Sequence, residues 1–425
     1  MRDLEQKVLA PLNHTGRQFM VIVLGFIILI AIMVYSWFYQ IFTGLTVTGL
    51  SQPVPWGIYI MNFIFFISIS IAGTLISGIL RLMKQDWANP ITRIAEMVTI
   101  ISVIIAFLNI MFDIGRPQRL FNMFFYGNST SPFVWDTIVI VIYLLASAAY
   151  LYFPMVPDLA RLAPKVPRMR FFYRLLSNGY TGTEEQKKEL HRMILTLAIM
   201  VTATVVMVHT VLSWVFGLMK SQPSWHDAIM GPYFISGALI TGLPILIIIA
   251  AIFRKAYGLE KYFKLEMFDK LGKLMLVLIL IYLYLFVAET LTKDYAAEAT
   301  THSTSEALWF GEFAWITWSM VIIGFLVPMV ILTFKRTRTY KGILLASGIL
   351  FVAMWVKRFI IVVPGLTRYL LPYENGIYIP SGIEWALTLG SMALFGLMFA
   401  IFSKLFPMVS IWEVEEMEEF KGEVD

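Results

Sequence analysis

FMVIVLGFIILIAIMVYSWFYQI, residues 19–41, contains no charged side chain. About 20 apolar residues in a helix span the roughly 30 Å hydrocarbon core of a bilayer, so this segment is long enough to cross a membrane. Runs of the same kind recur along the chain and predict about ten transmembrane segments, at residues 19–41, 56–80, 91–112, 133–153, 192–219, 228–253, 268–290, 311–334, 341–363 and 382–406. Because backbone groups in lipid must be satisfied within the segment, we expect helices. The sequence therefore predicts an all-α polytopic membrane protein, with residues 1–425 forming a single transmembrane domain.

The composition narrows the possible chemistry. Hydrophobic residues make up 59% of the chain and charged residues 14%, whereas soluble domains carry about 25% charged residues. There is no cysteine, which excludes a thiolate-bound iron–sulfur cluster, a cysteine zinc site and a disulfide. Only one histidine, His209, lies well inside a predicted span, whereas a cytochrome b-like bundle needs paired axial histidines. We therefore expect no haem, no iron–sulfur cluster and no metal site in this chain, and nothing indicates nucleic-acid binding.

Basic residues are distributed unequally between alternate loops. When the termini and the even-numbered loops are assigned to one side, the opposite loops hold only Arg116, Arg119, Lys220, Lys293 and Arg368. Loops rich in lysine and arginine remain in the cytoplasm. The sequence therefore predicts a multi-pass protein with both termini cytoplasmic.

A faint repeat relates spans that lie four helices apart. Asp113 and Glu289 end the third and seventh spans on the outer side, and Asp136 and Glu312 begin the fourth and eighth spans there. Because paired spans run in the same direction, the pattern predicts two four-helix bundles with the first and last spans peripheral. No extended sequence match accompanies the repeat, so a chance pattern stays open.

Ionisable residues at membrane depth are concentrated in the predicted outer half. Each costs about 2.5–3.5 kcal/mol near the bilayer centre, so each one needs a reason. The outer group comprises Asp113, Asp136, His209, Glu289, Glu312, Lys357, Arg358 and Glu384. The inner half offers mainly Arg93 and Glu96, which form either a local ion pair or part of a proton route. The outer group is therefore the main indication of a functional site.

Several of these outer residues also have a structural interpretation. Asp113 could pair with Arg116, and Asp136 could cap its helix, where a carboxylate suits the positive end of the helix dipole. His209 could be an interhelical hydrogen bonder. Tryptophans such as Trp135 are expected at a membrane boundary in any case. The alternative for both aspartates is a carboxylate that exchanges protons beside a pocket.

Two linked motifs carry a resemblance to a known family. Asp113-Ile114-Gly115-Arg116-Pro117 ends one span, and Ser131-Pro132-Phe133-Val134-Trp135-Asp136 opens the next. This pattern resembles the NrfD/PsrC family of quinone-interacting membrane subunits, from which it departs only at Ile114 and Phe133. The start of the second span at Trp56 also fits. Within the family, the ten spans are most similar to the DsrP-like subunits of sulfate reducers and to Hdr-like menaquinol-oxidising membrane subunits.

The resemblance implies a menaquinone or menaquinol pocket near the outer face of a prokaryotic cell membrane. It also implies an extracytoplasmic, ferredoxin-like iron–sulfur partner subunit and further redox subunits of an anaerobic respiratory complex. Asp113 and Asp136 then become the catalytic acids, with Arg116 as their ordering partner and Trp56 and Trp135 as cofactor-binding residues. Four further cofactor-binding candidates are named from depth alone: His209, Glu289, Lys357 and Arg358.

Two other functions compete with this hypothesis. A secondary transporter would use buried charges as an ion or substrate route, usually near the midplane and on broken helices. A structural anchor for soluble partners would have no quinone affinity and would tolerate every buried carboxylate substitution. The sequence leaves open the direction of electron flow and whether protons cross the membrane.

Overall fold

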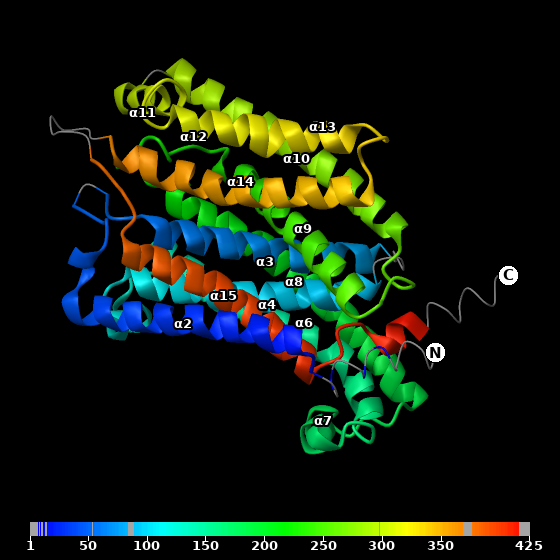
Figure 1. Ribbon diagram of the computed structural model, residues 1–425. Coiled ribbons are helices and arrows are strands. Elements are labelled where there is room, and N and C mark those ends of the chain that lie inside the picture. The colour runs from blue at the N-terminus through cyan, green and yellow to red at the C-terminus, as the bar shows by residue number, and fades with distance from the viewer. Residues whose placement is uncertain are drawn as a thin grey trace.

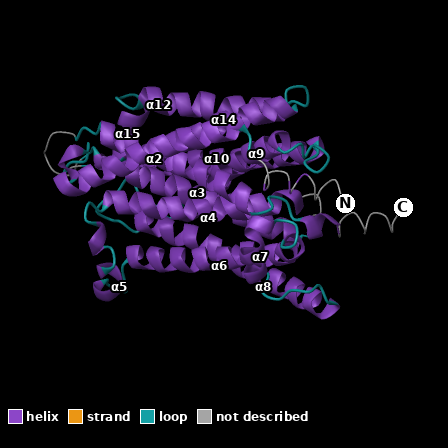
Figure 2. Ribbon diagram, turned by 60° about the horizontal axis from the view of Figure 1, so that its bottom comes forward, coloured by secondary structure: helices purple, strands orange, loops and turns teal. Residues whose placement is uncertain are grey.

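The computed structural model describes residues 15–52, 54–83, 89–296, 298–368 and 376–415, together with Lys7, Leu9 and Leu12 (Figure 1). Within these residues the chain forms helices and no strand (Figure 2). Ten helical segments are long and apolar enough to cross a membrane, and each coincides with one predicted span. The prediction of an all-α polytopic protein is therefore confirmed.

The spans are continuous helices except for the eighth, which contains a π-helical turn. They are α2 (Arg17–Thr43), α3 (Ile58–Leu82), α4 (Asn89–Asp113), α6 (Pro132–Leu162), α8 (Glu184–Gly217), α9 (Met230–Ala256), α10 (Leu265–Ala296), α12 (Ala314–Ser319) with the π turn Met320–Leu326 and α13 (Val327–Thr333), α14 (Tyr340–Leu366) and α15 (Gly382–Leu405). Shorter helices between them are α5 (Asn122–Tyr126), α7 (Arg170–Leu176) and α11 (Ala299–Trp309).

The helices form two four-helix bundles. In the first bundle α3, α4, α6 and α8 pack in a closed ring, and in the second α9, α10, α13 and α14 do the same. Packing of α3 against α9 joins the bundles, and α2 and α15 lie together as a peripheral pair (Figure 1). This arrangement is the one that the repeat predicts. We call the end of the helices that carries Asp113 and Asp136 the outer end, and the opposite end the inner end.

Helix α3 is the central helix of the molecule. In its most apolar window 94% of the residues are buried, the highest share of any span in the described part of the chain. Close packing against α4 requires Gly73, because a Cβ atom there would lie 2.1 Å from the carbonyl oxygen of Ala95. Small residues of this kind let membrane helices approach each other.

Several predicted spans are too short. Span 133–153 continues as α6 to Leu162, and span 192–219 already begins at Glu184. The apolar run marks only the part of a helix that lies in lipid, whereas the helix itself continues through polar residues in water. The segment between these two spans is correspondingly short, and it contains α7.

Glu384 has a structural role at the outer end. Its side chain accepts hydrogen bonds from Gly49 N (2.7 Å), from the Tyr378 hydroxyl (2.7 Å) and, in a capping box with Ser381, from Ser381 N (2.8 Å). The Tyr378 hydroxyl in turn accepts a bond of 2.8 Å from Ile58 N at the start of α3. Burial and then the charge of Glu384 raise the pKa of Tyr378 well above its ordinary value, so this tyrosine remains a donor. The network fixes the entrance to α3 beside Trp56.

Candidate functional site

A cavity of about 190 Å³ lies inside the first bundle near its outer end. It is bordered by α3, α4, α6 and α8, and most of its lining residues are apolar or aromatic. Asp113 and Asp136 are the two charged residues that line it. The structure thus brings both predicted acids together, and we call this space the Asp113–Asp136 cavity.

Asp113 reaches the cavity because α4 ends there. The chain turns at Gly115, whose φ of +67° is a conformation that glycine adopts readily. The Oδ1 atom of Asp113 is buried and has no hydrogen-bond partner in the described part of the chain, so the salt-bridge interpretation finds no support there. Arg116 is exposed and does not line the cavity, so the structure does not bring it to the carboxylate.

Asp136 lines the cavity from α6, the helix next to α4 in the ring. Helix α6 begins at Pro132 with Ser131 before it, so Asp136 lies just beyond the first turn instead of at the cap position. The capping interpretation is therefore wrong, because the helix begins earlier than that interpretation requires. Asp136 is 6% exposed, and its Oδ1 atom has no hydrogen-bond partner among the residues described. Each aspartate thus holds a buried oxygen atom that the described fold does not use.

Trp56 supplies part of the aromatic wall. Its ring stacks on Trp225 with centroids 5.5 Å apart and an angle of 12° between the planes. It also meets Phe216 and Phe133 edge-on, at 5.8 Å and 6.0 Å. These contacts fix the ring beside the two carboxylates. Trp135, in contrast, does not line the cavity, and its Nε1 donates to the carbonyl oxygen of Ser129 at 2.6 Å.

Two of the depth-based candidates lie deeper, outside this cavity. His209 is fully buried, with Nδ1 3.1 Å from the Val205 carbonyl oxygen and Nε2 without a hydrogen-bond partner among the residues described. Arg358 donates to Thr241 Oγ1 at 3.3 Å and lies over the ring of Phe234 at 5.8 Å. The prediction that these two residues bind the cofactor gains no support from their positions.

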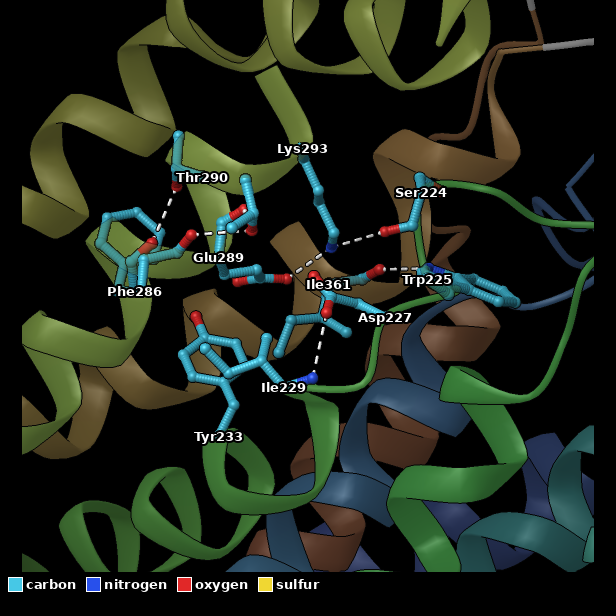
Figure 3. Close-up of polar contacts among 12 residues, drawn as sticks. Ser224, Trp225, Asp227, Ile229, Tyr233, Phe286, Glu289, Thr290, Lys293 and Ile361 are labelled. Atoms are coloured by element: carbon cyan, nitrogen blue, oxygen red, sulfur yellow. Dashed lines mark hydrogen bonds and ion pairs between the residues drawn. The ribbon is translucent and has the colours of Figure 1, made fainter. Parts of the chain in front are cut away.

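Glu289 and Lys357 line a different cavity, of about 80 Å³, in the second bundle. Figure 3 shows Glu289 and Lys293 meeting on α10, with Oε1 and Nζ 2.6 Å apart. Lys293 also donates to the Ser224 carbonyl oxygen at 2.8 Å. Lys357 lies over the ring of Phe286 at 4.4 Å. We call this space the Glu289–Lys357 cavity.

The stacked pair of Trp56 and Trp225 lies between the two cavities, because Trp56 lines the first and Trp225 the second. The prediction from membrane depth alone therefore placed in one site residues that belong to different bundles. The partner of Glu289, Lys293, was missed, although its position four residues later on a helix is a readable signal. Glu312, the repeat mate of Asp136, pairs with Arg368 at the surface instead of lining a cavity.

Comparison with known proteins agrees with this architecture. The chain is 25% identical over 410 residues to a selenate reductase subunit of Mesobacillus selenatarsenatis, covering 91% of this chain and 93% of that protein. It is 26% identical over 393 residues to the "Hdr-like menaquinol oxidoreductase integral membrane subunit" of Archaeoglobus fulgidus, covering 87% and 89%. It is 23% identical over 326 residues to a putative dimethyl sulfoxide reductase membrane subunit of Halobacterium salinarum, covering 76% and 72%. The family profile described as "Polysulphide reductase, NrfD" matches residues 46–369, most of the chain, and the chain therefore belongs to the NrfD family.

Proposed function

We propose that this chain is the quinone-binding membrane subunit of a respiratory oxidoreductase complex, and that the Asp113–Asp136 cavity binds the quinone head group. The observation that carries the proposal is a largely apolar cavity that holds two carboxylates with buried oxygen atoms lacking a partner among the described residues. Buried polar atoms without a protein partner ordinarily bind water or a ligand. A ligand with oxygen atoms on an aromatic ring fits this combination of a few polar groups in an apolar wall.

The size of the cavity supports a ring-shaped ligand. An engineered cavity of about 150 Å³ is enough to bind benzene, and the Asp113–Asp136 cavity measures about 190 Å³. The Glu289–Lys357 cavity, at about 80 Å³, is below that size. The name of the Archaeoglobus fulgidus relative includes menaquinol, which favours menaquinone or menaquinol as the bound species.

A bound quinol supplies two electrons and two protons on oxidation, and the reverse reaction consumes them. The two aspartates would each hold or release a proton at a carboxylate oxygen. This requires a distance of about 2.6–3.2 Å to the ligand oxygen. The ring of Trp56, fixed by Trp225 and Phe216, would orient the head group and exclude water from one side.

The electrons would pass to or from another subunit. No group of three or more metal-ligating side chains occurs in the described part of the chain, and the sequence contains no cysteine. We therefore propose an iron–sulfur partner subunit docked over the outer end, on the extracytoplasmic side of the membrane. Both termini would then be cytoplasmic, as the distribution of basic residues predicts.

Asp113→Asn and Asp136→Asn test the proposal in the purified complex. Each variant should assemble, bind a quinone analogue and lose about 100-fold or more in quinol turnover, because a positioned proton acceptor contributes a factor of about 10²–10⁴. Glu312→Gln is the control, since Glu312 is an acid of the outer end that lines neither cavity. Normal turnover in both aspartate variants would contradict the site assignment and favour a transporter or an anchor.

A further inference from the structure

Helix α7 (Arg170–Leu176) lies near the inner end of the first bundle, across the direction of the spans, and Figure 1 shows it nearly end-on. The Tyr173 hydroxyl donates to the carbonyl oxygen of Leu405, the last residue of α15, at 2.7 Å. The Tyr152 hydroxyl of α6 donates to the Leu176 carbonyl oxygen at 2.8 Å. Two hydrogen bonds thus attach this short helix to two spans.

Both contacts lie at the level where an apolar run ends. Tyr152 is the penultimate residue of the run 133–153, and Leu405 is the penultimate residue of the run 382–406. Helix α6 continues from Tyr152 to Leu162, about 15 Å farther along its axis. The chain therefore leaves the lipid region and then returns through residues 163–169. This return brings α7 back to the level at which the hydrocarbon region ends.

The side of α7 that faces away from the bundle is apolar. Phe171, Phe172 and Leu175 are 72%, 53% and 64% exposed, whereas Tyr173 is fully buried. Leu175 follows the two phenylalanines by four and three residues, so the three side chains share one side of the helix. We call them the α7 apolar face. A helix that lies in the membrane interface buries such a face about 5–10 Å into the boundary between head groups and acyl chains.

Arginines without a protein partner accompany this face. Arg168, Arg170 and Arg174 are exposed, and none of them forms an ion pair within the described part of the chain. We call them the α7 arginines. Arg161 differs, because its Nη1 lies 2.6 Å from Glu415 Oε2. From residue 159 to residue 183 the chain contains five basic residues and no acidic residue, so this segment carries a strong local positive charge.

We propose that the α7 apolar face and the α7 arginines bind anionic phospholipids of the inner leaflet. The apolar face inserts among the upper acyl chains, and the guanidinium groups donate hydrogen bonds to phosphate oxygens, which their planar shape fits. Basic amphipathic helices with aromatic residues at a membrane surface recognise such lipids.

The position of α7 favours lipid over a soluble partner subunit as the occupant. The hydrogen bonds of Tyr173 and Tyr152 hold the helix at the hydrocarbon boundary, and Figure 1 shows it at the edge of the molecule. A soluble subunit would instead meet surfaces that project beyond the lipid, such as the end of α6 at Leu162. The lipid site shares no residue with the Asp113–Asp136 cavity, so it does not depend on the proposed function.

A fluorophore at position 175 tests the proposal. Because the chain has no cysteine, Leu175→Cys carries a single label. The labelled full chain is reconstituted in zwitterionic bilayers with a minor fraction of brominated phosphatidylglycerol or brominated phosphatidylcholine, whose bromine atoms quench fluorescence on contact. We expect both lipids to quench the label. Phosphatidylglycerol should bind there at least about tenfold more strongly, because each arginine near an anionic surface contributes a factor of about five.

Glu185→Cys is the matched control for depth. Glu185 is exposed on α8, seven residues before the apolar run that begins at residue 192, or about 10 Å farther from the lipid. A label there should be quenched by iodide in the water and by neither lipid. Quenching of the label at position 175 by iodide and by neither lipid would overturn the proposal, as would equal quenching by the two lipids.

Charge variants locate the site. In the Leu175→Cys chain, Arg170→Gln with Arg174→Gln should reduce the preference for phosphatidylglycerol about tenfold or more. Lys335→Gln with Arg336→Gln removes the same charge from an exposed inner loop of the second bundle and should leave the preference unchanged. An unchanged preference in the α7 variant would overturn the assignment to these arginines. In the complete complex, protection of position 175 from both iodide and brominated lipid would show a partner subunit on α7 and overturn the lipid proposal.

Discussion

The substitution Asp136→Asn distinguishes a carboxylate that takes part in the reaction from one that stabilises the fold. Asp136 is 6% exposed, and its Oδ1 atom has no partner in the part of the chain that the structure describes. Asp136→Asn keeps the shape of the side chain and removes its ability to exchange a proton. The substitution therefore removes no contact on which the described fold depends.

The expected size of the effect follows from that geometry. Breaking a buried ion pair costs about 3–5 kcal/mol, and losing a helix cap costs about 1 kcal/mol. We expect neither loss for Asp136→Asn. The free energy of unfolding should stay within about 0.5 kcal/mol of the unmodified chain, because no described contact is lost. Glu289→Gln is the contrast, since it breaks the 2.6 Å pair with Lys293 and should cost up to about 3 kcal/mol.

Thermal unfolding of the purified chain in detergent measures the stability change, and quinol oxidation by the assembled complex measures activity. Asp136→Asn should unfold near the temperature of the unmodified chain while turnover falls about 100-fold or more. A midpoint as low as that of Glu289→Gln would show that Asp136 is a structural group. Asp136 would then not be the residue that exchanges protons with the quinol.

Four further substitutions test the aromatic wall of the cavity, the packing of α3 against α4 and the orientation in the membrane. Trp56→Ala removes an aromatic ring from the cavity wall; an aromatic contact with the head group is worth about 0.5–1.5 kcal/mol, so the KM for quinol should rise up to about tenfold; an unchanged KM would remove Trp56 from the site. Gly73→Ala places a Cβ atom 2.1 Å from the Ala95 carbonyl oxygen and should destabilise the chain by about 1–3 kcal/mol in thermal unfolding, whereas no loss would argue against this helix contact. Because the chain has no cysteine, Tyr126→Cys and Phe171→Cys, at positions 85% and 72% exposed, can be labelled singly. An impermeant maleimide should label Tyr126→Cys and not Phe171→Cys in intact cells, and the reverse pattern would invert the orientation.

The fold could be predicted from the sequence because the membrane imposes a simple length rule. Each apolar run such as 19–41 became one membrane-spanning helical segment, and the acids spaced four spans apart indicated the two bundles. Helix ends such as Leu162 of α6 could not be predicted, because beyond the lipid a helix is stabilised by contacts that hydropathy does not record.

The candidate site could be predicted from the sequence only where a motif gave information besides the depth of a residue in the membrane. Asp113 and Asp136 lie on one cavity, as the linked motifs indicate. Glu289 and Lys357 were grouped with them by depth alone, which gives a height along the helix but neither the direction of the side chain nor its bundle. A motif does not give the direction of a side chain either. Trp135 belongs to the motif, but its side chain turns toward Ser129 instead of the cavity.

Photoaffinity labelling with an azido-menaquinone tests most directly whether the Asp113–Asp136 cavity binds the quinone. In the assembled complex, we expect covalent labelling within the segments of α3, α4, α6 and α8 that line the Asp113–Asp136 cavity, and an excess of unlabelled menaquinol should suppress it. Labelling confined to the Glu289–Lys357 cavity, or labelling that menaquinol does not suppress, would contradict this assignment.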